Sequence, residues 1–377
     1  MNSNKQQKVY LDYNASTPID PRVEKVMKDA MTNAFGNPSG PHWAGAPARS
    51  LVESARDKVA GVLGCRPGEI VFTSGGSESN NQVLKSAFYS SQSQTPHIIT
   101  TSVEHPAIVE PCRFLERLGA KITWLPVDKT GLINVDDLRN AITPDTVLIS
   151  VMHANNEVGT IQPIAQCARI AREYGIPLHT DAAQTVGKIP TRVDELGVDF
   201  LTIAGHKFYA PKGIGALFVR GGSKIEPLIH GAGHESGRRA GTESAILTAA
   251  LGEACDIARN LSGTHEVQAL RDRLWTALKE LCGDRLVLNG HPRERLPNTL
   301  NVSFTGHVGS EILAQLPWLA ASTGSACHAN RIELSPVLRA MGVTPESGAG
   351  AVRFSLGSAT STEEIESVIA GLIPLVT

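Results

Sequence analysis

The chain is organised around one segment, Thr202-Ile203-Ala204-Gly205-His206-Lys207-Phe208-Tyr209, which lies between two apolar runs. The run before it, Val198-Asp199-Phe200-Leu201, and the run after it, Ala216-Leu217-Phe218-Val219, are typical of buried strands. At the end of a strand and among small residues, Lys207 suits an amine that forms an imine, because desolvation lowers its pKa and frees its lone pair for a carbonyl. On this segment alone, a surface lysine after a strand remains the alternative.

Strands and helices alternate on the N-terminal side of this segment, as a doubly wound α/β sheet requires. Several predicted strands are continuous β-branched or apolar runs, which are typical of parallel strands covered on both faces. The strands predicted besides the two runs near Lys207 are Ile70–Thr73, His97–Thr100, Ile122–Leu125, Val147–Val151 and Leu178–Thr180. Helices are predicted from Pro21 to about Ala34, Ala46 to Leu63 and Thr242 to Asn260. The sequence therefore predicts a large α/β domain over residues 21–260, with a mostly parallel sheet flanked by helices.

Residues 261–377 alternate less strictly, which is typical of a smaller α+β domain. Leu261-Ser262-Gly263 is the predicted hinge into it. The elements predicted there are a helix through Leu281, a strand at Asn301–Phe304, a helix from Ser310, a loop from Ser322 to Asn330, a strand at Val352–Ser355 and a helix from Thr362. We expect residues 1–20, which include the extended stretch Val9–Ala15, to form an N-terminal arm that packs near the smaller domain.

Composition narrows the class of protein. The 377 residues are 41% hydrophobic, enough for two domains, and the formal net charge of -2 gives no electrostatic footprint for nucleic acid. No apolar run approaches the roughly 18 to 20 residues of a membrane span, and the polar start Met1–Lys5 lacks a signal-peptide core. The six cysteines are scattered without a CxxC pair, which argues against a metal site or a disulfide framework. We therefore expect a cytoplasmic globular protein without a bound metal.

Chemistry in such sheets lies beyond the carboxyl ends of the strands. After the first predicted strand, Ser74-Gly75-Gly76-Ser77 leads into a helix and offers backbone N–H groups and a helix dipole to an anion. The glycine spacing matches neither a Walker motif nor GxGxxG, so a lone phosphate group is favoured over a nucleotide. An ordinary helix N-cap is the alternative.

The next strand ends carry groups suited to an aromatic cofactor. His105, in Ser102-Val103-Glu104-His105, could stack on a flat ring or pass protons, and Asn156 could bind a phenolic oxygen or a carboxylate. Asp181 could face a protonated pyridine nitrogen and make the ring an electron sink. Each residue also has a structural alternative: a satisfied histidine, a turn amide, an N-capping aspartate. Together with Lys207 they predict a phosphate cradle, a stacking group, a pyridinium partner and an imine lysine along one sheet edge.

This set resembles the cysteine desulfurases, in the class V aminotransferase branch of the fold-type-I pyridoxal-phosphate (PLP) enzymes, and the resemblance covers nearly the whole chain. The most specific motifs are LDYNASTP (11–18), FGNPS (35–39), FTSGGSESNN (72–81), SVEH (102–105), HANNEVG (153–159), HTDAAQ (179–184), GHKFYAPKGIG (205–215), AGTES (240–244), STGSACH (322–328) and VRFSLG (352–357).

The resemblance implies a role for each matched residue. It makes Lys207 the Schiff-base lysine, His105 the stacking histidine and Asp181 the partner of the pyridine nitrogen, with Asn156 and Gln184 near the ring substituents. It assigns the cofactor phosphate to Gly76, Ser77 and His206, and to Thr242 of the other subunit of a homodimer. Many desulfurases have serine where this chain has Ala204, and we expect Thr202 or Ser77 to replace the missing hydroxyl.

Cys327 lies in Ser322-Thr323-Gly324-Ser325-Ala326-Cys327-His328, where small residues favour a mobile, accessible thiol over a buried structural one. With the resemblance, this predicts a persulfide on Cys327. Lys207 would remove the α-proton of L-cysteine and Arg353 would bind its carboxylate. The sulfur would pass to an acceptor protein, for iron–sulfur cluster assembly or thiolation, and L-alanine would be released.

A selenocysteine lyase is the alternative, because DFLTIAGHKFY and Ala326-Cys327-His328 resemble those enzymes, which share the fold and PLP. Ser335 to Gly342 (SPVLRAMG) resembles housekeeping desulfurases instead. An aminotransferase of the same fold would not need Cys327, and the missing GxGxxG disfavours a nicotinamide enzyme.

Overall fold

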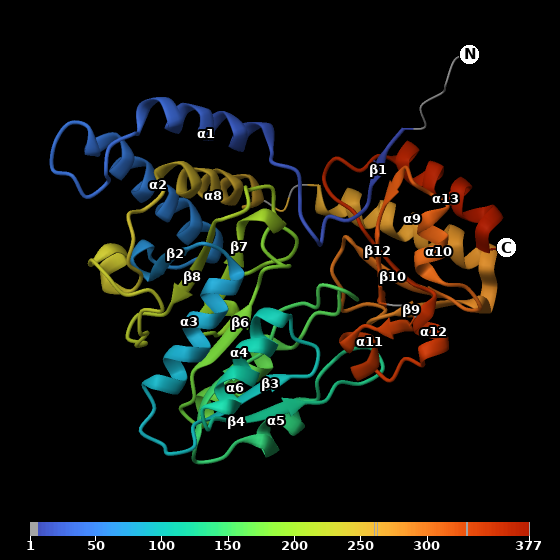
Figure 1. Ribbon diagram of the computed structural model, residues 1–377, viewed down its shortest axis with the longest axis horizontal. Helices are drawn as coiled ribbons and strands as arrows, with labels where there is room; N and C mark the ends of the chain where they lie inside the picture. Colours follow the sequence, from blue (N-terminus) through green and yellow to red (C-terminus); the bar gives the residue numbers. More distant parts are fainter. Residues whose placement is uncertain (1–6, 260, 262, 329–330, 377) are drawn as a thin grey trace.

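The computed structural model describes residues 7–259, 261, 263–328 and 331–376; of residues 325–328 and 331–333 it describes the backbone alone. A seven-stranded sheet has the order β2-β8-β7-β6-β5-β3-β4 (Figure 1). Its strands are β2 (Ile70–Thr73), β3 (His97–Thr101), β4 (Lys121–Leu125), β5 (Thr146–Ser150), β6 (Leu178–Asp181), β7 (Phe200–Ala204) and β8 (Gly215–Val219). Neighbours from β4 to β7 are parallel, and β8 runs antiparallel to both β7 and β2. Six strands therefore share one carboxyl edge.

Helices cover both faces of this sheet, which explains why several of its strands are continuous apolar or β-branched runs. Ile99, Ile149 and Leu201 point into the core on one face, while their neighbours Ile98, Leu148 and Phe200 point into the core on the other. The helices of the first face are α1 (Pro21–Asn33), α2 (Gly45–Leu63), α5 (Val135–Ala141), α6 (Ile164–Glu173), α7 (Val193–Leu196) and α8 (Ala245–Ala258), and those of the second are α3 (Gly76–Tyr89) and α4 (Pro106–Arg117). We call this sheet with its helices the large-sheet unit.

A second, antiparallel sheet has the order β12-β15-β10-β9. Its strands are β9 (Leu286–Asn289), β10 (Thr299–Phe304), β12 (Ser322–Thr323) and β15 (Ala351–Ser355), and the helices on it are α9 (Thr264–Cys282), α10 (Gly309–Ala314) and α13 (Thr362–Val376). Two short helices, α11 (Pro336–Ala340) and α12 (Pro345–Ala349), precede β15. We call this sheet with its helices the small-sheet unit. The predicted mostly parallel α/β sheet with a smaller α+β part is confirmed.

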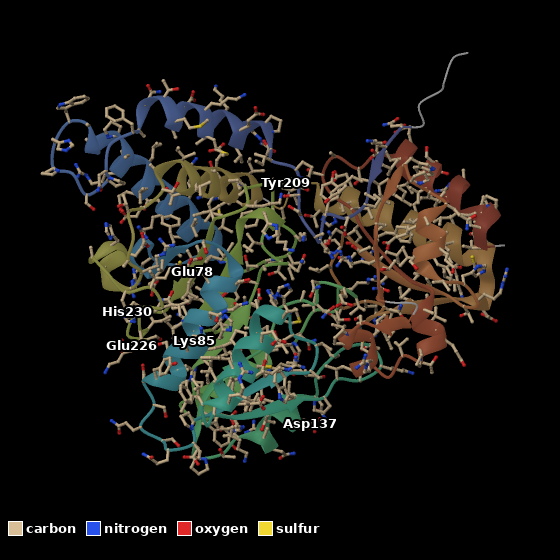
Figure 2. All side chains as sticks on the ribbon, in the orientation of Figure 1. Glu78, Lys85, Asp137, Tyr209, Glu226 and His230 are labelled. Carbon is tan, nitrogen blue, oxygen red and sulfur yellow. The ribbon has the colours of Figure 1, made fainter. Side chains whose placement is uncertain are left out.

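The N-terminal arm lies against the small-sheet unit (Figure 1). Its strand β1 (Val9–Tyr10) pairs in parallel with β11 (Leu319–Ala320), and Val9 and Leu11 are part of that unit's core. The two units also meet at Tyr209, labelled in Figure 2, whose hydroxyl accepts a hydrogen bond from Ser358 N at 2.8 Å. The domain boundaries at residues 20 and 260 stay predictions, and Ser262 of the predicted hinge lies outside the described residues.

Two elements differ from the sequence-based expectation. The strand before Lys207 is β7, two residues later than the predicted run from Val198, so Ala204 ends it and Lys207 follows in a single 3-10 turn, Gly205–Lys207. The predicted loop from Ser322 is wrong: β12 is followed by β13 (Ser325–His328), which pairs antiparallel with β14 (Arg331–Leu334). Its residues have weak strand propensity, and pairing with β14 overrides that local preference. Asn330, the last residue of that loop, lies outside the described chain.

Candidate active site

A cavity of about 260 Å³ opens at the shared carboxyl edge of the strands. Predicted and unpredicted residues line it together, and they come from the segments that follow β2, β3, β5, β6 and β7. They are Gly76, Ser77, Asn80, His105, Ala107, Met152, Ala154, Asn156, Asp181, Ala183, Gln184, Ala204, His206 and Lys207. The structure therefore gathers most of the predicted cofactor residues around one space.

Lys207 is half-buried and lines the cavity, where we expect an imine-forming amine. Its Nζ donates hydrogen bonds to the backbone carbonyls of Asn14 at 2.8 Å and Ala15 at 2.9 Å. Burial and the charge of Arg353 lower the pKa of Lys207 to about 8, against the opposing charges of Asp181 and Asp12. A pKa of about 8 leaves roughly a tenth of this amine deprotonated at pH 7, far more than in an ordinary lysine, and the deprotonated form is the one that attacks a carbonyl.

Asp181 is the buried carboxylate of the cavity. Its Oδ1 accepts a hydrogen bond from Ala183 N at 2.9 Å, and its Oδ2 accepts one from Asn80 Nδ2 at 2.7 Å. These two donors fix the carboxylate at the end of β6. Asn80, which the sequence analysis did not single out, lies one helical turn after Ser77 and so on the same face of α3. Its Oδ1 is buried and has no hydrogen-bond partner in the described part of the chain, so it is an open acceptor at the cavity.

The N-terminus of α3 forms one end of the cavity. Gly75 precedes the helix with a φ of 147°, a conformation that favours glycine, and a Cβ on Gly215 would lie 2.7 Å from Gly75 Cα. This close approach sets the start of α3 beside the start of β8, where Gly215 pairs with Ala204 at the end of β7. Gly76 and Ser77 thus present the helix terminus to the cavity opposite His206, as an anion site requires.

Ala204 lines this end and contributes no hydroxyl. The expectation that Thr202 could replace it is wrong, because Thr202 is fully buried and its Oγ1 is bonded to His179 Nε2 at 3.0 Å. Thr202 and Ala204 point to the same face of β7, because they are two residues apart in the strand, but the hydroxyl of Thr202 is already bonded to His179. Ser77 remains as the hydroxyl at the helix start.

His105 caps α4 and faces the cavity. Its Nδ1 accepts a hydrogen bond from Ala107 N at 3.0 Å, so in the neutral ring Nε2 carries the proton. This cap fixes the ring at the helix start, as a stacking role needs. The Nδ1 atom of His206 forms a hydrogen bond with Ser16 Oγ at 3.4 Å. Burial, together with the charges of Lys207 and Lys212, lowers the pKa of His206 to about 4.

Asn156 and Gln184 lie on the arm side of the cavity. The backbone carbonyl of Asn156 accepts hydrogen bonds from Asn14 Nδ2 at 3.1 Å and Arg353 NH1 at 3.0 Å. Gln184 Nε2 donates to the carbonyl of Asn14 at 2.9 Å, and its Oε1 accepts from Lys188 Nζ at 3.1 Å. Asn14 and Lys188 were not predicted as site residues.

Arg353 comes from β15 of the small-sheet unit and approaches this side. Its NH2 donates to Asp12 Oδ1 at 2.6 Å and Ser322 Oγ at 2.8 Å, while its buried Nε has no acceptor among the described residues. Arg353 is therefore a fixed cation, next to Asn156, with a donor left for an anion.

Of the predicted residues whose side chains the structure describes, Arg353 and Thr242 do not line the cavity. Thr242 is exposed on the segment before α8 and does not line it. The backbone of Cys327 lies in β13, opposite Ile332 of β14, and its side chain lies outside the described set. The persulfide assigned to Cys327 stays a prediction.

The cavity suits PLP on its own chemistry. It offers the amine of Lys207 with a lowered pKa, the fixed carboxylate of Asp181, a helix N-terminus for a phosphate and the unsatisfied acceptor of Asn80. Within the described ranges, no three His, Cys, Asp or Glu side chains are grouped to hold a metal ion, and no helix is long and apolar enough to cross a membrane.

Comparisons with known proteins agree on one family. A model of the family described as Aminotransferase class-V matches residues 9–368. The cysteine desulfurase IscS of Dictyoglomus turgidum is 48% identical over 362 residues, which cover 95% of this chain and 91% of the relative. That of Methanosarcina thermophila is 44% identical over 370 residues, covering 96% and 90%.

Solved structures give the same result. A NifS-like protein superposes with a TM-score of 0.92 at 37% identity, covering 98% of this chain and 99% of that one. A structure described as SspA in complex with cysteine has a TM-score of 0.83 at 37% identity, covering 94% of this chain and all of that one, 100%.

Proposed function

The chain belongs to the class V aminotransferase family and is a PLP-dependent cysteine desulfurase, and we propose that Lys207 and Cys327 carry its two chemical tasks. L-Cysteine is the substrate, in keeping with relatives that are named for this activity and with a related structure that contains cysteine. The observation that most supports the assignment of Lys207 is its amine of lowered pKa, set in one cavity with Asp181 and the start of α3.

PLP, when bound, supplies an electron sink for the carbanion formed at the substrate α-carbon. Asp181 would hold a proton on the ring nitrogen, because its two oxygens are already fixed by Asn80 and Ala183 N. Gly76, Ser77 and His206 would bind the phosphate, with Asn156 and Gln184 beside the ring and His105 stacked on it. Lys207 would bind the cofactor through Nζ and, once released, remove the α-proton.

The substrate carboxylate would bind Arg353. Its Nε is the donor that no described residue satisfies, and the contacts with Asp12 and Ser322 hold the guanidinium in one orientation. A planar guanidinium recognises a carboxylate with two parallel donors, so this site favours an α-amino acid over a simple amine.

Cys327 would take the sulfur. Its thiolate forms an S–S bond with the substrate sulfur as the substrate C–S bond breaks, and the carbon fragment gains a proton and leaves as L-alanine. Each turnover thus converts L-cysteine and a thiol into L-alanine and a persulfide, without an external oxidant. An acceptor protein then removes the outer sulfur, for iron–sulfur cluster assembly or thiolation. We further propose a cytoplasmic homodimer in which Thr242 reaches the cofactor phosphate of the partner subunit.

The test is Cys327→Ser. The variant should keep the absorbance of bound PLP and lose the release of sulfide from L-cysteine in the presence of a reducing thiol. Cys65→Ser is the matched control, because burial raises the pKa of the Cys65 thiol to about 12 and leaves it unreactive. Sulfide release at the wild-type rate by Cys327→Ser would remove Cys327 from the reaction.

L-Selenocysteine is the second substrate of that assay. A selenocysteine lyase would turn it over in strong preference to L-cysteine, and that result would overturn the choice of substrate.

A further inference from the structure

The N-terminal arm contributes the groups that hold the amine of Lys207. The carbonyl of Asn14 accepts from Lys207 Nζ at 2.8 Å and from Gln184 Nε2 at 2.9 Å. The carbonyl of Ala15 accepts from the same Nζ at 2.9 Å. Two successive backbone carbonyls of one segment therefore converge on an amine almost two hundred positions away in the chain.

Asn14 is held in place from both units of the molecule. It is 1% exposed, and its Nδ2 donates to Thr299 Oγ1 at 2.8 Å and to the carbonyl of Asn156 at 3.1 Å. Its Oδ1 accepts from Asn298 Nδ2 at 3.0 Å and its backbone N–H donates to Ser355 Oγ at 2.9 Å. Every polar group of this residue is thus engaged, and its carbonyl cannot turn away from Lys207 without breaking several buried hydrogen bonds.

The neighbouring arm residues follow the same course. Thr17 N donates to the carbonyl of His206 at 2.9 Å, and Thr17 Oγ1 accepts from Tyr209 N at 2.6 Å. The arm therefore runs alongside the turn that carries Lys207 and is fastened on both sides of it.

We propose that Asn14 is a positioning residue for Lys207: the carbonyls of Asn14 and Ala15 receive the lysine amine whenever it is not bound to the cofactor, and hold it at the point from which it moves the substrate proton. This inference builds on the proposed function, in which Lys207 is released when the substrate amine takes its place. A released lysine has a flexible four-carbon stem, so fixed acceptors keep it within reach of the α-carbon during turnover.

The charges around Lys207 make the hydrogen bonds to the two carbonyls important for the protonation state of its amine. Burial and the cation Arg353 disfavour the ammonium form of Lys207, and the anions Asp181 and Asp12 favour it. The charge of Lys207 in turn lowers the pKa of the buried Lys188. His105 and His206 also interact with Lys207. The carbonyl acceptors stabilise the ammonium, because a hydrogen bond to a charged group is stronger than one to its neutral form. Loss of their alignment should therefore lower the pKa of the amine and slow the proton transfer.

Asn14→Ala tests this, since it removes the anchoring side chain and leaves the backbone carbonyl. The first readout is the pH dependence of PLP uptake by apoenzyme, which reports the deprotonated Lys207 amine. We expect its midpoint to fall by about one pH unit, the shift that one hydrogen bond to a charged group is worth. The second readout is turnover with L-cysteine deuterated at the α-carbon. We expect kcat to fall by up to about 10²-fold with a larger isotope effect, and KM to change little, because Arg353 still binds the carboxylate.

Asn289→Ala is the matched control. Asn289 lies in β9 of the small-sheet unit and, like Asn14, is a buried asparagine, 3% exposed. Its Nδ2 donates to Asn301 Oδ1 and Ser303 Oγ, both at 2.9 Å, and not to the arm. Asn289→Ala should lose about as much stability as Asn14→Ala, but it should keep the wild-type pH midpoint of PLP uptake and the wild-type isotope effect. Thr299→Val removes one anchor of Asn14 without changing the arm, and should show a smaller shift in the same directions; it decides the question if Asn14→Ala does not fold.

A wild-type pH midpoint and isotope effect in both Asn14→Ala and Thr299→Val would overturn the inference and leave Asn14 as a structural link between the units. Failure of the proposed function looks different: wild-type apoenzyme would then take up no PLP at Lys207, whatever the Asn14 variants do.

Discussion

Glu104 is a buried carboxyl directly before His105. Its Oε1 accepts from Met152 N at 2.8 Å and Thr101 Oγ1 at 2.9 Å, and its buried Oε2 lacks a partner among the residues described. Burial raises the pKa of Glu104 to about 8, and the charge of Asp181 adds to the shift. At neutral pH Glu104 is thus largely a neutral acid, which leaves Asp181 as the carboxylate of the cavity.

This raised pKa gives a residue-scale prediction for Glu104→Gln. In the unfolded chain the carboxyl ionises above about pH 4.3, whereas in the folded chain it stays protonated to about pH 8. The stability that Glu104 contributes is therefore full below the unfolded pKa and is lost as the pH rises toward 8. Glutamine does not titrate, so the variant should gain stability relative to wild type by up to about 1.4 kcal/mol per pH unit across this window.

Urea unfolding of Glu104→Gln and wild type at pH 4.5, 6 and 8, with saturating PLP, measures this difference in stability. A constant difference between Glu104→Gln and wild type at all three values would contradict a raised pKa of Glu104.

At the scale of elements, the segment between β8 and α8 depends on one buried ion pair. Arg56 of α2 binds Glu235 with two hydrogen bonds, NH1 to Oε2 at 2.9 Å and NH2 to Oε1 at 2.8 Å, and Glu235 Oε2 also accepts from Phe72 N at 2.9 Å. Glu235 and Ser236 both have positive φ values, 49° and 58°, which cost energy in residues other than glycine. The pair therefore holds a strained turn in the segment that leads to Thr242.

Glu235→Gln should destabilise the protein by about 3 kcal/mol, because it leaves the buried Arg56 with only the exposed and more distant Glu53, at 3.7 Å, as a counter-ion. The fall in the urea midpoint of unfolding measures the loss. Arg113→Gln is the control, because its partner Glu110 forms an exposed pair on α4, with side-chain exposures of 59% and 62%, and such pairs contribute little. Equal midpoints for Glu235→Gln and wild type would show that the turn does not need the ion pair.

The sequence locates best the strands that are long enough and rich enough in apolar or β-branched residues to form a pattern. Strands β2 to β5 are rich in apolar and β-branched residues, while β6 (Leu-His-Thr-Asp) is mostly polar but buried, and each was located to within about a residue or two. The short strands β1, β11 and β12 have two residues each, too few for a pattern, and they exist because their partners lie beside them. β13 was missed because Ser325 and Ala326 do not favour strands on their own.

The same distinction holds for the cavity. Asp181, Asn156 and Lys207 were predicted because a parallel sheet collects its strand ends at one edge. Asn14 and Asn80 were missed for opposite reasons. Asn80 needed the helical register from Ser77, which the sequence contains, whereas the contact of Asn14 with Lys207 spans 193 positions and no local pattern encodes it.

At the scale of the whole molecule, the role that the family resemblance gives to Thr242, which is exposed in the single chain, predicts a homodimer. The chain should sediment at twice its 40.1 kDa, and Thr242→Val should leave that mass unchanged while weakening PLP binding about tenfold, through loss of one hydrogen bond to a charged phosphate. Titration of apoenzyme with PLP, followed by fluorescence, measures the affinity.

Thr32→Val is the control for that titration, since Thr32 is an exposed threonine on α1 whose hydroxyl bonds its own helix. A monomer by sedimentation, or unchanged PLP affinity in Thr242→Val, would contradict the role given to Thr242.

The pairing of β1 with β11 has a consequence for biosynthesis. Asn14 and Ser355 are joined by a hydrogen bond across 341 positions, so Asn14 waits for this partner while the residues between them are synthesised. At typical elongation rates of about 5–20 residues per second, that wait lasts some tens of seconds. Lys207 is likewise synthesised before Ser355, so the Asn14 carbonyl that accepts from its amine is anchored only after the small-sheet unit has been made.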